Sequence, residues 1–178
     1  MTFVETSERN FLARMWLTAF VAALLCLAAT ALAFAETKSL KGVALIIGQS
    51  NYQHIAALPN PANDARDMAK MLTDLGFDAR NVTDRDAAKL KRDLERFVED
   101  AEGADVAFIY YSGHGIEAGG ENYLVPVDAD VSSLKDANSA LVPISAVMDE
   151  LKKTVPVTIV LLDACRTNPF PADAVVRR

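Results

Sequence analysis

Short apolar runs, separated by segments with helical periodicity, constrain the fold of this chain more than any other feature. Three of them, VALIIG (43–48), VAFIYY (106–111) and VTIVLL (157–162), are rich in β-branched residues and carry no charge. Strands that are apolar on both faces belong inside a parallel sheet covered by helices on each side. The alternation therefore predicts an α/β fold with a mostly parallel sheet.

The segments between these runs have the apolar spacing of amphipathic helices. Asn60 precedes Pro61 at the start of the first helix, and we predict that it caps that helix. A more polar strand at 77–82 suits a sheet edge, and a further short strand is expected at 123–127. The predicted helices span residues 61–75, 86–101 and 145–153.

Residues 16–35, WLTAFVAALLCLAATALAFA, form an uncharged run that follows two arginines and ends in a small-x-small pattern before Glu36. This pattern predicts an export signal that is cleaved before Glu36, with a periplasmic or secreted product. The uncharged run is nearly long enough for a transmembrane helix, so an uncleaved inner-membrane anchor is the alternative. Residues 1–35 are therefore interpreted as a signal peptide or membrane anchor. Cys26 follows Leu25 rather than a small residue, which argues against a lipoprotein.

The charged and metal-binding residues exclude several classes of function. The net charge is −6, from 18 Lys and Arg against 24 Asp and Glu, without a basic cluster, so nucleic acid is not an expected partner. The two cysteines, Cys26 and Cys165, cannot form a disulfide framework or a Cys-x-x-Cys site. With only His54 and His114 available, a zinc site would rest on carboxylates, and no metal site is predicted.

Two of the predicted strands end in residues that carry chemistry. The run 106–111 leads into Ser-Gly-His-Gly with His114, and the run 157–162 leads into Asp-Ala-Cys-Arg with Cys165. Ligands of open α/β sheets bind at the carboxyl ends of the strands. If these two strands are parallel neighbours, the thiol and the imidazole share one rim and form a nucleophile with its proton shuttle. The N–H groups of Gly115 and Cys165 would then stabilise an oxyanion.

A bland interpretation stands beside this one. A lone cysteine at a strand end is usually a small buried apolar residue, and a lone Gly-His-Gly is usually a tight turn. Catalysis is favoured only because His114 and Cys165 both follow buried strands and would share one rim.

The segments YYSGHG, YLVPVDA and IVLLDACR, with the histidine about fifty residues before the cysteine, resemble the large-subunit part of the caspase and metacaspase superfamily. Within this superfamily, the chain is most similar to bacterial caspase-like proteins. The similarity lies in the segments VALIIGQSNY, PANDARDM and DACRTNPF. The resemblance covers residues 41–170. It implies a cysteine endopeptidase with a Cys165–His114 dyad that acts on peptides or proteins. It also implies a three-layer sandwich with strand order 2-1-3-4.

The resemblance to metacaspases also implies a substrate preference. It assigns Asp64 and Asp163 to a pocket that binds Arg or Lys before the scissile bond, through charge-assisted hydrogen bonds. Asp64 can equally be a helix-start residue favoured by the helix dipole. Arg66 and Arg166 do not match the arginine that follows the first strand in caspases. His54 has no partner motif and is expected to be an ordinary exposed or capping residue.

Some metacaspases bind calcium, but the carboxylates available here do not follow a calcium-loop spacing, so no cofactor is expected. These carboxylates are Asp128, Asp130 and Asp136.

The superfamily pattern continues beyond the nucleophile with a small-subunit segment of two further strands. Residues 171–178 are therefore interpreted as a truncated tail, with the fourth strand as an edge that a small-subunit-like chain would complete. Two other functions stay open. The first is a catalytically inactive caspase-like interaction module. The second is a flavodoxin-like ligand-binding domain, which the glycine-poor segment 48–51 disfavours because such a domain needs a phosphate loop there.

Overall fold

The computed structural model describes residues 15–23, 39–118, 120–130 and 140–165. The chain divides into two units, Met1–Ser39 and Leu40–Arg178. In the first unit, residues 15–23 are helical and exposed. Within the described ranges, none of the helices has both the length and the hydrophobicity to cross a membrane. Residues 24–35 lie outside those ranges, so the signal or anchor stays a prediction.

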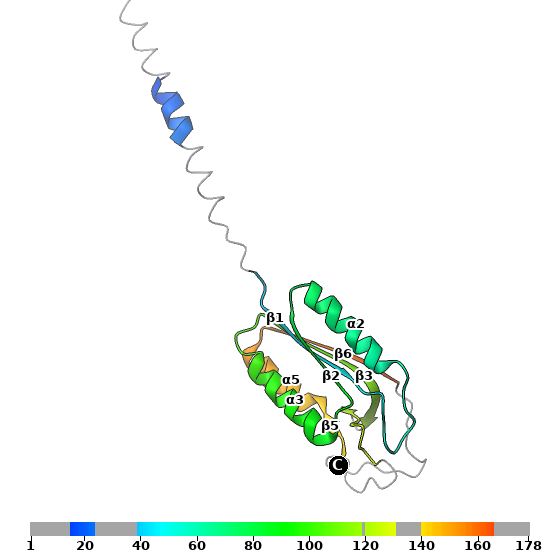
Figure 1. Cartoon of the computed structure of the whole chain (residues 1–178). Helices are drawn as coiled ribbons and strands as arrows, with labels where there is room; N and C mark the ends of the chain where they lie inside the picture. Colours follow the sequence, from blue (N-terminus) through cyan, green and yellow to red (C-terminus); the bar gives the residue numbers. More distant parts are fainter. Residues whose placement is uncertain (1–14, 24–38, 119, 131–139, 166–178) are drawn as a thin grey trace, which may run out of the picture. The chain divides into compact units, whose positions relative to one another are not determined.

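The second unit is built on a sheet of both parallel and antiparallel strands (Figure 1). Four strands are parallel, in the order β2, β1, β3, β6, while β4 and β5 extend the sheet from β3 in antiparallel fashion. The predicted order of the four parallel strands is thereby confirmed, with the polar strand at the edge. The strands are β1 (Gly42–Gly48), β2 (Asp78–Thr83), β3 (Val106–Ala118), β4 (Glu121–Leu124), β5 (Val142–Pro143) and β6 (Val157–Cys165).

Helices cover both faces of the sheet, as predicted: α2 lies on one face, and α3 and α5 lie on the other (Figure 1). Successive residues of β1 alternate between the two layers, so Ala44 and Ile46 pack toward α2 while Leu45 and Ile47 pack toward α3 and α5. Every residue of β1 is buried for this reason. The helices are α2 (Pro61–Asp74), α3 (Ala87–Asp100) and α5 (Ile144–Thr154).

The start of α2 differs from the prediction. Asn60 occupies the cap position, but its side chain makes no capping hydrogen bond. Instead, the Ala62 N–H donates to the Ser50 hydroxyl at 3.1 Å, so a residue beyond β1 caps the helix. The start of α3 is conventional, because Asp86 accepts a hydrogen bond from the Lys89 N–H at 2.7 Å.

Two strands are longer than predicted. β3 continues through Ser-Gly-His-Gly to Ala118, and β6 continues to Cys165. Gly113 and Gly115 are typical of a turn and have a low strand propensity. The hydrogen bonds that pair this segment with the neighbouring strands outweigh that propensity. β3 changes partner along its length: it pairs with β6 up to His114 and with β4 from Gly115 onward. The short strand predicted at 123–127 lies at Glu121–Leu124.

Candidate active site

His114 and Cys165 are register partners, the last pair of the parallel ladder between β3 and β6. Residues 51 positions apart in the sequence thus lie opposite each other on one rim. Register partners on adjacent strands project to the same face of a sheet. The side chain of Cys165 lies outside the described part, so its catalytic role stays a prediction.

The imidazole of His114 is held from one side. Its Nε2 lies 2.9 Å from the Ala56 carbonyl oxygen, and its ring packs edge-on against Tyr52 with a centroid distance of 4.6 Å. A carbonyl oxygen only accepts hydrogen bonds, so Nε2 carries the proton. In that tautomer Nδ1 has a free lone pair. The Nδ1 atom is buried and has no hydrogen-bond partner among the described residues, which leaves it available as a proton acceptor.

Two tyrosines fix the backbone of His114. The His114 N–H donates to the Tyr52 hydroxyl at 2.8 Å, and the Tyr111 hydroxyl donates to the His114 carbonyl oxygen at 2.6 Å. Their hydroxyls are 3.4 Å apart. Burial raises the pKa of Tyr52 to about 12 and raises the pKa of Tyr111 well above its ordinary value. Both phenols therefore keep their protons at neutral pH.

The glycines beside His114 are required by packing. A Cβ at Gly113 would stand 2.7 Å from the Tyr52 hydroxyl, and one at Gly115 would stand 2.8 Å from the Ala164 Cβ. Close contact with the chain's own residues is a sufficient reason for both.

The loop after β1 carries both Tyr52 and Ala56, and two side chains hold it. The Asp84 carboxylate accepts hydrogen bonds from the N–H groups of Ser50 and Asn51 at 2.8 and 2.9 Å. Burial raises the pKa of Asp84, but these N–H donors outweigh that effect and hold the pKa below its ordinary value.

The buried Gln49 side chain is the second anchor of this loop, because it exchanges two hydrogen bonds with the Arg85 backbone. The carbonyl that orients His114 therefore belongs to an anchored loop.

Sequence reasoning missed three residues of this arrangement: Tyr52, Ala56 and Tyr111. Ala56 contributes only a backbone carbonyl, which no side-chain pattern reveals. Tyr111 ends an apolar run and resembled a core residue, and it is indeed fully buried. A buried tyrosine hydroxyl needs a hydrogen-bond partner. This requirement is the one feature of the sequence that indicates a polar role for Tyr111.

The two carboxylates predicted to bind Arg or Lys, Asp163 and Asp64, both act on the hydroxyl of Tyr110. The Tyr110 hydroxyl donates to Asp163 at 3.2 Å. Burial raises the pKa of Tyr110, and the negative charges of Asp163 and Asp64 raise it further against an opposing Ser112 hydrogen bond. The substrate-binding role of Asp64 and Asp163 stays a prediction. Asp64 also stands in the first turn of α2, so the helix-start explanation accounts for it equally well.

The remaining candidate residues that the structure describes are not grouped into a site. His54 and Arg66 are exposed, while Arg166 and Asp136 lie outside the described residues. In the ranges that the structure describes, no three His, Cys, Asp or Glu side chains are grouped to hold a metal ion. Asp128 accepts a hydrogen bond from the Ala87 N–H at 2.9 Å and so supports the start of α3.

The outer edge of β6 is uncovered in the described part of the chain, where β6 pairs only with β3. Alternate side chains of this strand form an apolar stripe between 42% and 47% exposed. The stripe consists of Val157, Ile159 and Leu161.

Comparisons with known proteins agree with this architecture. A family model described as the caspase domain matches residues 41–177. The human mucosa-associated lymphoid tissue lymphoma translocation protein 1 is 29% identical over 124 residues, and its mouse homologue is 28% identical. Each alignment covers 70% of this chain but 15% of the relative, so this chain spans a small part of their length.

Among solved structures, a Geobacter sulfurreducens protein has a TM-score of 0.52 at 22% identity. The superposition covers 70% of this chain and 50% of that one, and it concerns the fold alone.

Proposed function

Because the chain belongs to the caspase-domain family, we propose that it is a cysteine endopeptidase whose catalytic pair is Cys165 and His114. Membership establishes the caspase type of peptidase domain, whereas the pair, turnover by this chain and the specificity are proposed. The observation that carries the proposal is the register of β3 and β6, which aligns these two residues on one rim.

The proposed reaction begins with proton transfer from the Cys165 thiol to Nδ1 of His114. The hydrogen bond from Nε2 to the Ala56 carbonyl keeps this tautomer and stabilises the resulting imidazolium. The thiolate then attacks the peptide carbonyl carbon, and the N–H groups of Gly115 and Cys165 hold the oxyanion. His114 returns the proton to the leaving amine. Water then hydrolyses the thioester and frees Cys165.

Alkylation of Cys165 by iodoacetamide tests the pair. In a Cys26→Ser background, Cys165 is the only thiol, and its rate near neutral pH should exceed that of a free thiol. His114→Ala should remove this advantage, about tenfold in rate, because the base is lost. The matched control is His54→Ala, which deletes the chain's other histidine at an exposed position. Equal rates in all three proteins would refute the dyad.

We further propose that Asp64 and Asp163 select Arg or Lys before the scissile bond, as their position near Tyr110 supports. Fluorogenic peptides with Arg, Lys or Asp at this position distinguish the specificities. Asp64→Asn and Asp163→Asn should each raise KM for the Arg peptide, because a charge-assisted hydrogen bond is lost. Asp67→Asn, an exposed carboxylate on the same helix, is the control. Preferred cleavage after Asp would contradict the basic pocket.

The alternative is a folded but inactive caspase-like interaction module. A stable protein that hydrolyses none of these peptides at high concentration, and whose Cys165 alkylates like a free thiol, would establish it.

We also propose that a small-subunit-like chain or segment pairs with the free edge of β6. The exposed stripe on the face of that strand supports this, because an unpaired edge beside exposed apolar side chains favours association. Leu161→Lys should then reduce any self-association seen by sedimentation, whereas Leu75→Lys, an exposed leucine after α2, should not. Equal effects of both variants would contradict the proposal.

For residues 1–35 we propose an export signal, with a membrane anchor as the alternative. Mass spectrometry of the protein recovered from an expressing cell gives the test: an N-terminus at Glu36 supports cleavage, and the intact chain in the membrane fraction supports anchoring.

A further inference from the structure

A second concave surface lies away from the rim, between α3 and α5 on the face of the sheet opposite α2. This α3–α5 groove encloses about 520 Å³ and shares no residue with the proposed peptidase site. Its lining residues are Lys91, Leu94, Glu95, Val98, Glu99, Val142, Pro143, Ala146, Val147 and Glu150.

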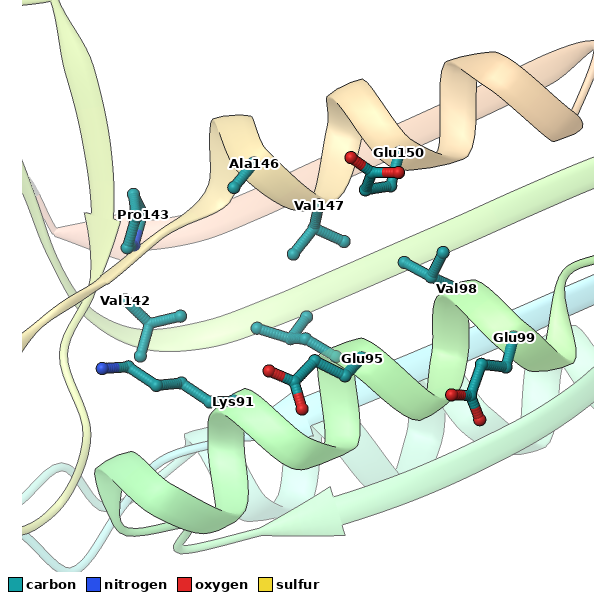
Figure 2. A pocket seen from close by; sticks show the side chains of 10 residues that line it. Lys91, Glu95, Val98, Glu99, Val142, Pro143, Ala146, Val147 and Glu150 are labelled. Atoms are coloured by element: carbon teal, nitrogen blue, oxygen red, sulfur yellow. The ribbon is translucent and has the colours of Figure 1, made fainter.

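The floor of the groove is apolar. Figure 2 shows Val98 of α3 and Val147 of α5 pointing into the space between the two helices, with Val142 and Pro143 at one end. The small side chain of Ala146 leaves the groove open on the α5 side. On α3 the lining residues recur every three or four positions from Lys91 to Glu99, which corresponds to a face about 12 Å long.

The rim of the groove is acidic. Glu95, Glu99 and Glu150 stand around the apolar floor, with Lys91 as the single cation among the lining residues. Glu150 pairs with Lys153 at 2.7 Å. The structure gives Glu95 and Glu99 no ion pair within the residues it describes. These two exposed carboxylates are therefore available to cations of a partner.

The sign of the charge selects the partner. Anionic membranes and nucleic acids carry the same sign as the rim and would be repelled. A second copy that docked this surface on itself would bring one acidic rim against another. An amphipathic helix with an apolar stripe flanked by Lys or Arg matches both the floor and the rim, and helices commonly bind in apolar grooves of this shape.

We propose that the α3–α5 groove docks a basic amphipathic helix of a partner protein. The apolar side chains of the partner helix insert between Val98 and Val147. The Lys or Arg side chains of that helix pair with Glu95 and Glu99. This docking function is separate from peptide cleavage and does not depend on the Cys165–His114 pair.

The probe is a fluorescein-labelled synthetic helix of about 14 residues, with leucines at helical spacing on one face and lysines beside them. A second peptide has glutamate in place of each lysine. Fluorescence anisotropy with the full chain should show the lysine peptide binding at least about tenfold more tightly, with an affinity that falls as salt rises.

Variants locate the binding site. Glu95→Lys with Glu99→Lys should weaken the lysine peptide about tenfold, because attraction becomes repulsion at two exposed positions. The matched control, Asp67→Lys with Asp74→Lys, makes the same charge change on exposed positions of α2. It should change the affinity less than about twofold. Ala146→Phe should narrow the groove and weaken binding of the lysine peptide without lowering the thermal midpoint, because Ala146 is exposed.

Several results would overturn the proposal. Equal binding of both peptides would show that the rim does not select for charge. Equal losses of affinity in the α3 and α2 charge variants would show that only the net charge of the protein matters. Self-association that Ala146→Phe abolishes, without peptide binding, would assign the groove to a second copy. A lower thermal midpoint for Ala146→Phe, again without peptide binding, would assign it to this chain's own segments. Circular dichroism of each variant confirms that it is folded.

Discussion

Replacing Tyr111 with phenylalanine isolates the hydroxyl that holds the backbone of His114. This hydroxyl donates to the His114 carbonyl at 2.6 Å and accepts from the Val125 N–H at 3.2 Å. The side chain is completely buried, so water cannot replace the lost donor.

The structure bounds the cost of this change. An unsatisfied buried polar group costs about 1–3 kcal/mol. The Val125 N–H also donates to the His114 carbonyl at 3.2 Å, and this bond survives in the variant. The substitution therefore removes hydrogen bonds without leaving a fully unpaired group, and we expect the free energy of unfolding to fall by about 1–2 kcal/mol.

Tyr110 provides the matched control, because it is the adjacent residue of β3 and its hydroxyl donates to the exposed Asp163. Tyr110 is itself buried, but water can hydrate the exposed Asp163 carboxylate once the phenol is gone. Tyr110→Phe should therefore lower the free energy of unfolding by only about 0.5 kcal/mol, the low end for a lost hydrogen bond. Urea unfolding followed by far-ultraviolet circular dichroism is the suitable assay, since the only tryptophan, Trp16, lies in the other unit. Equal destabilisation by the two variants would refute the reasoning.

Three further predictions concern the same neighbourhood. Because burial raises the pKa of Tyr52 from 10.0 to about 12, the unfolded chain loses this proton first as pH rises. The free energy of unfolding should therefore fall by about 2 kcal/mol between pH 10 and 12, and urea titrations of Tyr52→Phe should show a much smaller decrease. Asp84→Asn should cost about 1 kcal/mol at neutral pH, because the Ser50 N–H loses a charged acceptor. The difference from the wild type should shrink in acid, as pH falls through the lowered pKa of Asp84, and a constant difference in urea titrations would contradict this. Gly113→Ala should cost about 1–3 kcal/mol in thermal unfolding, because its Cβ would clash with the Tyr52 hydroxyl and the Gln49 Cβ; an unchanged midpoint would show that the loop yields.

Much of the fold followed from the sequence because the buried strands carry an unambiguous pattern. Val43–Gly48 and Val157–Leu162 are apolar on both faces, and only a parallel sheet between helix layers accommodates such strands. Helix ends were predicted within about two residues for the same reason: apolar periodicity stops where burial stops. The error at Asn60 arose because Ser50, distant in sequence, caps α2 instead.

The candidate site was less accessible to sequence reasoning. His114 and Cys165 could be named because both follow recognisable strands, and their pairing followed from the strand order. The groups that orient His114 come from a loop whose conformation is set by Asp84 and Gln49 through long-range hydrogen bonds. No local pattern encodes such contacts. The extension of β3 past Tyr111 was likewise decided by β4 and β6 rather than by its own glycines.

The dependence of the proposed pair on strand pairing limits how this protein can vary. A slip of β6 by one residue would set Ala164 against His114 and turn every side chain of the strand to the opposite layer. An insertion or deletion between Val106 and His114, or between Val157 and Cys165, should therefore abolish the proposed peptidase activity. Related chains should differ in length in their loops and helices, while the spacing within these two strands stays invariant.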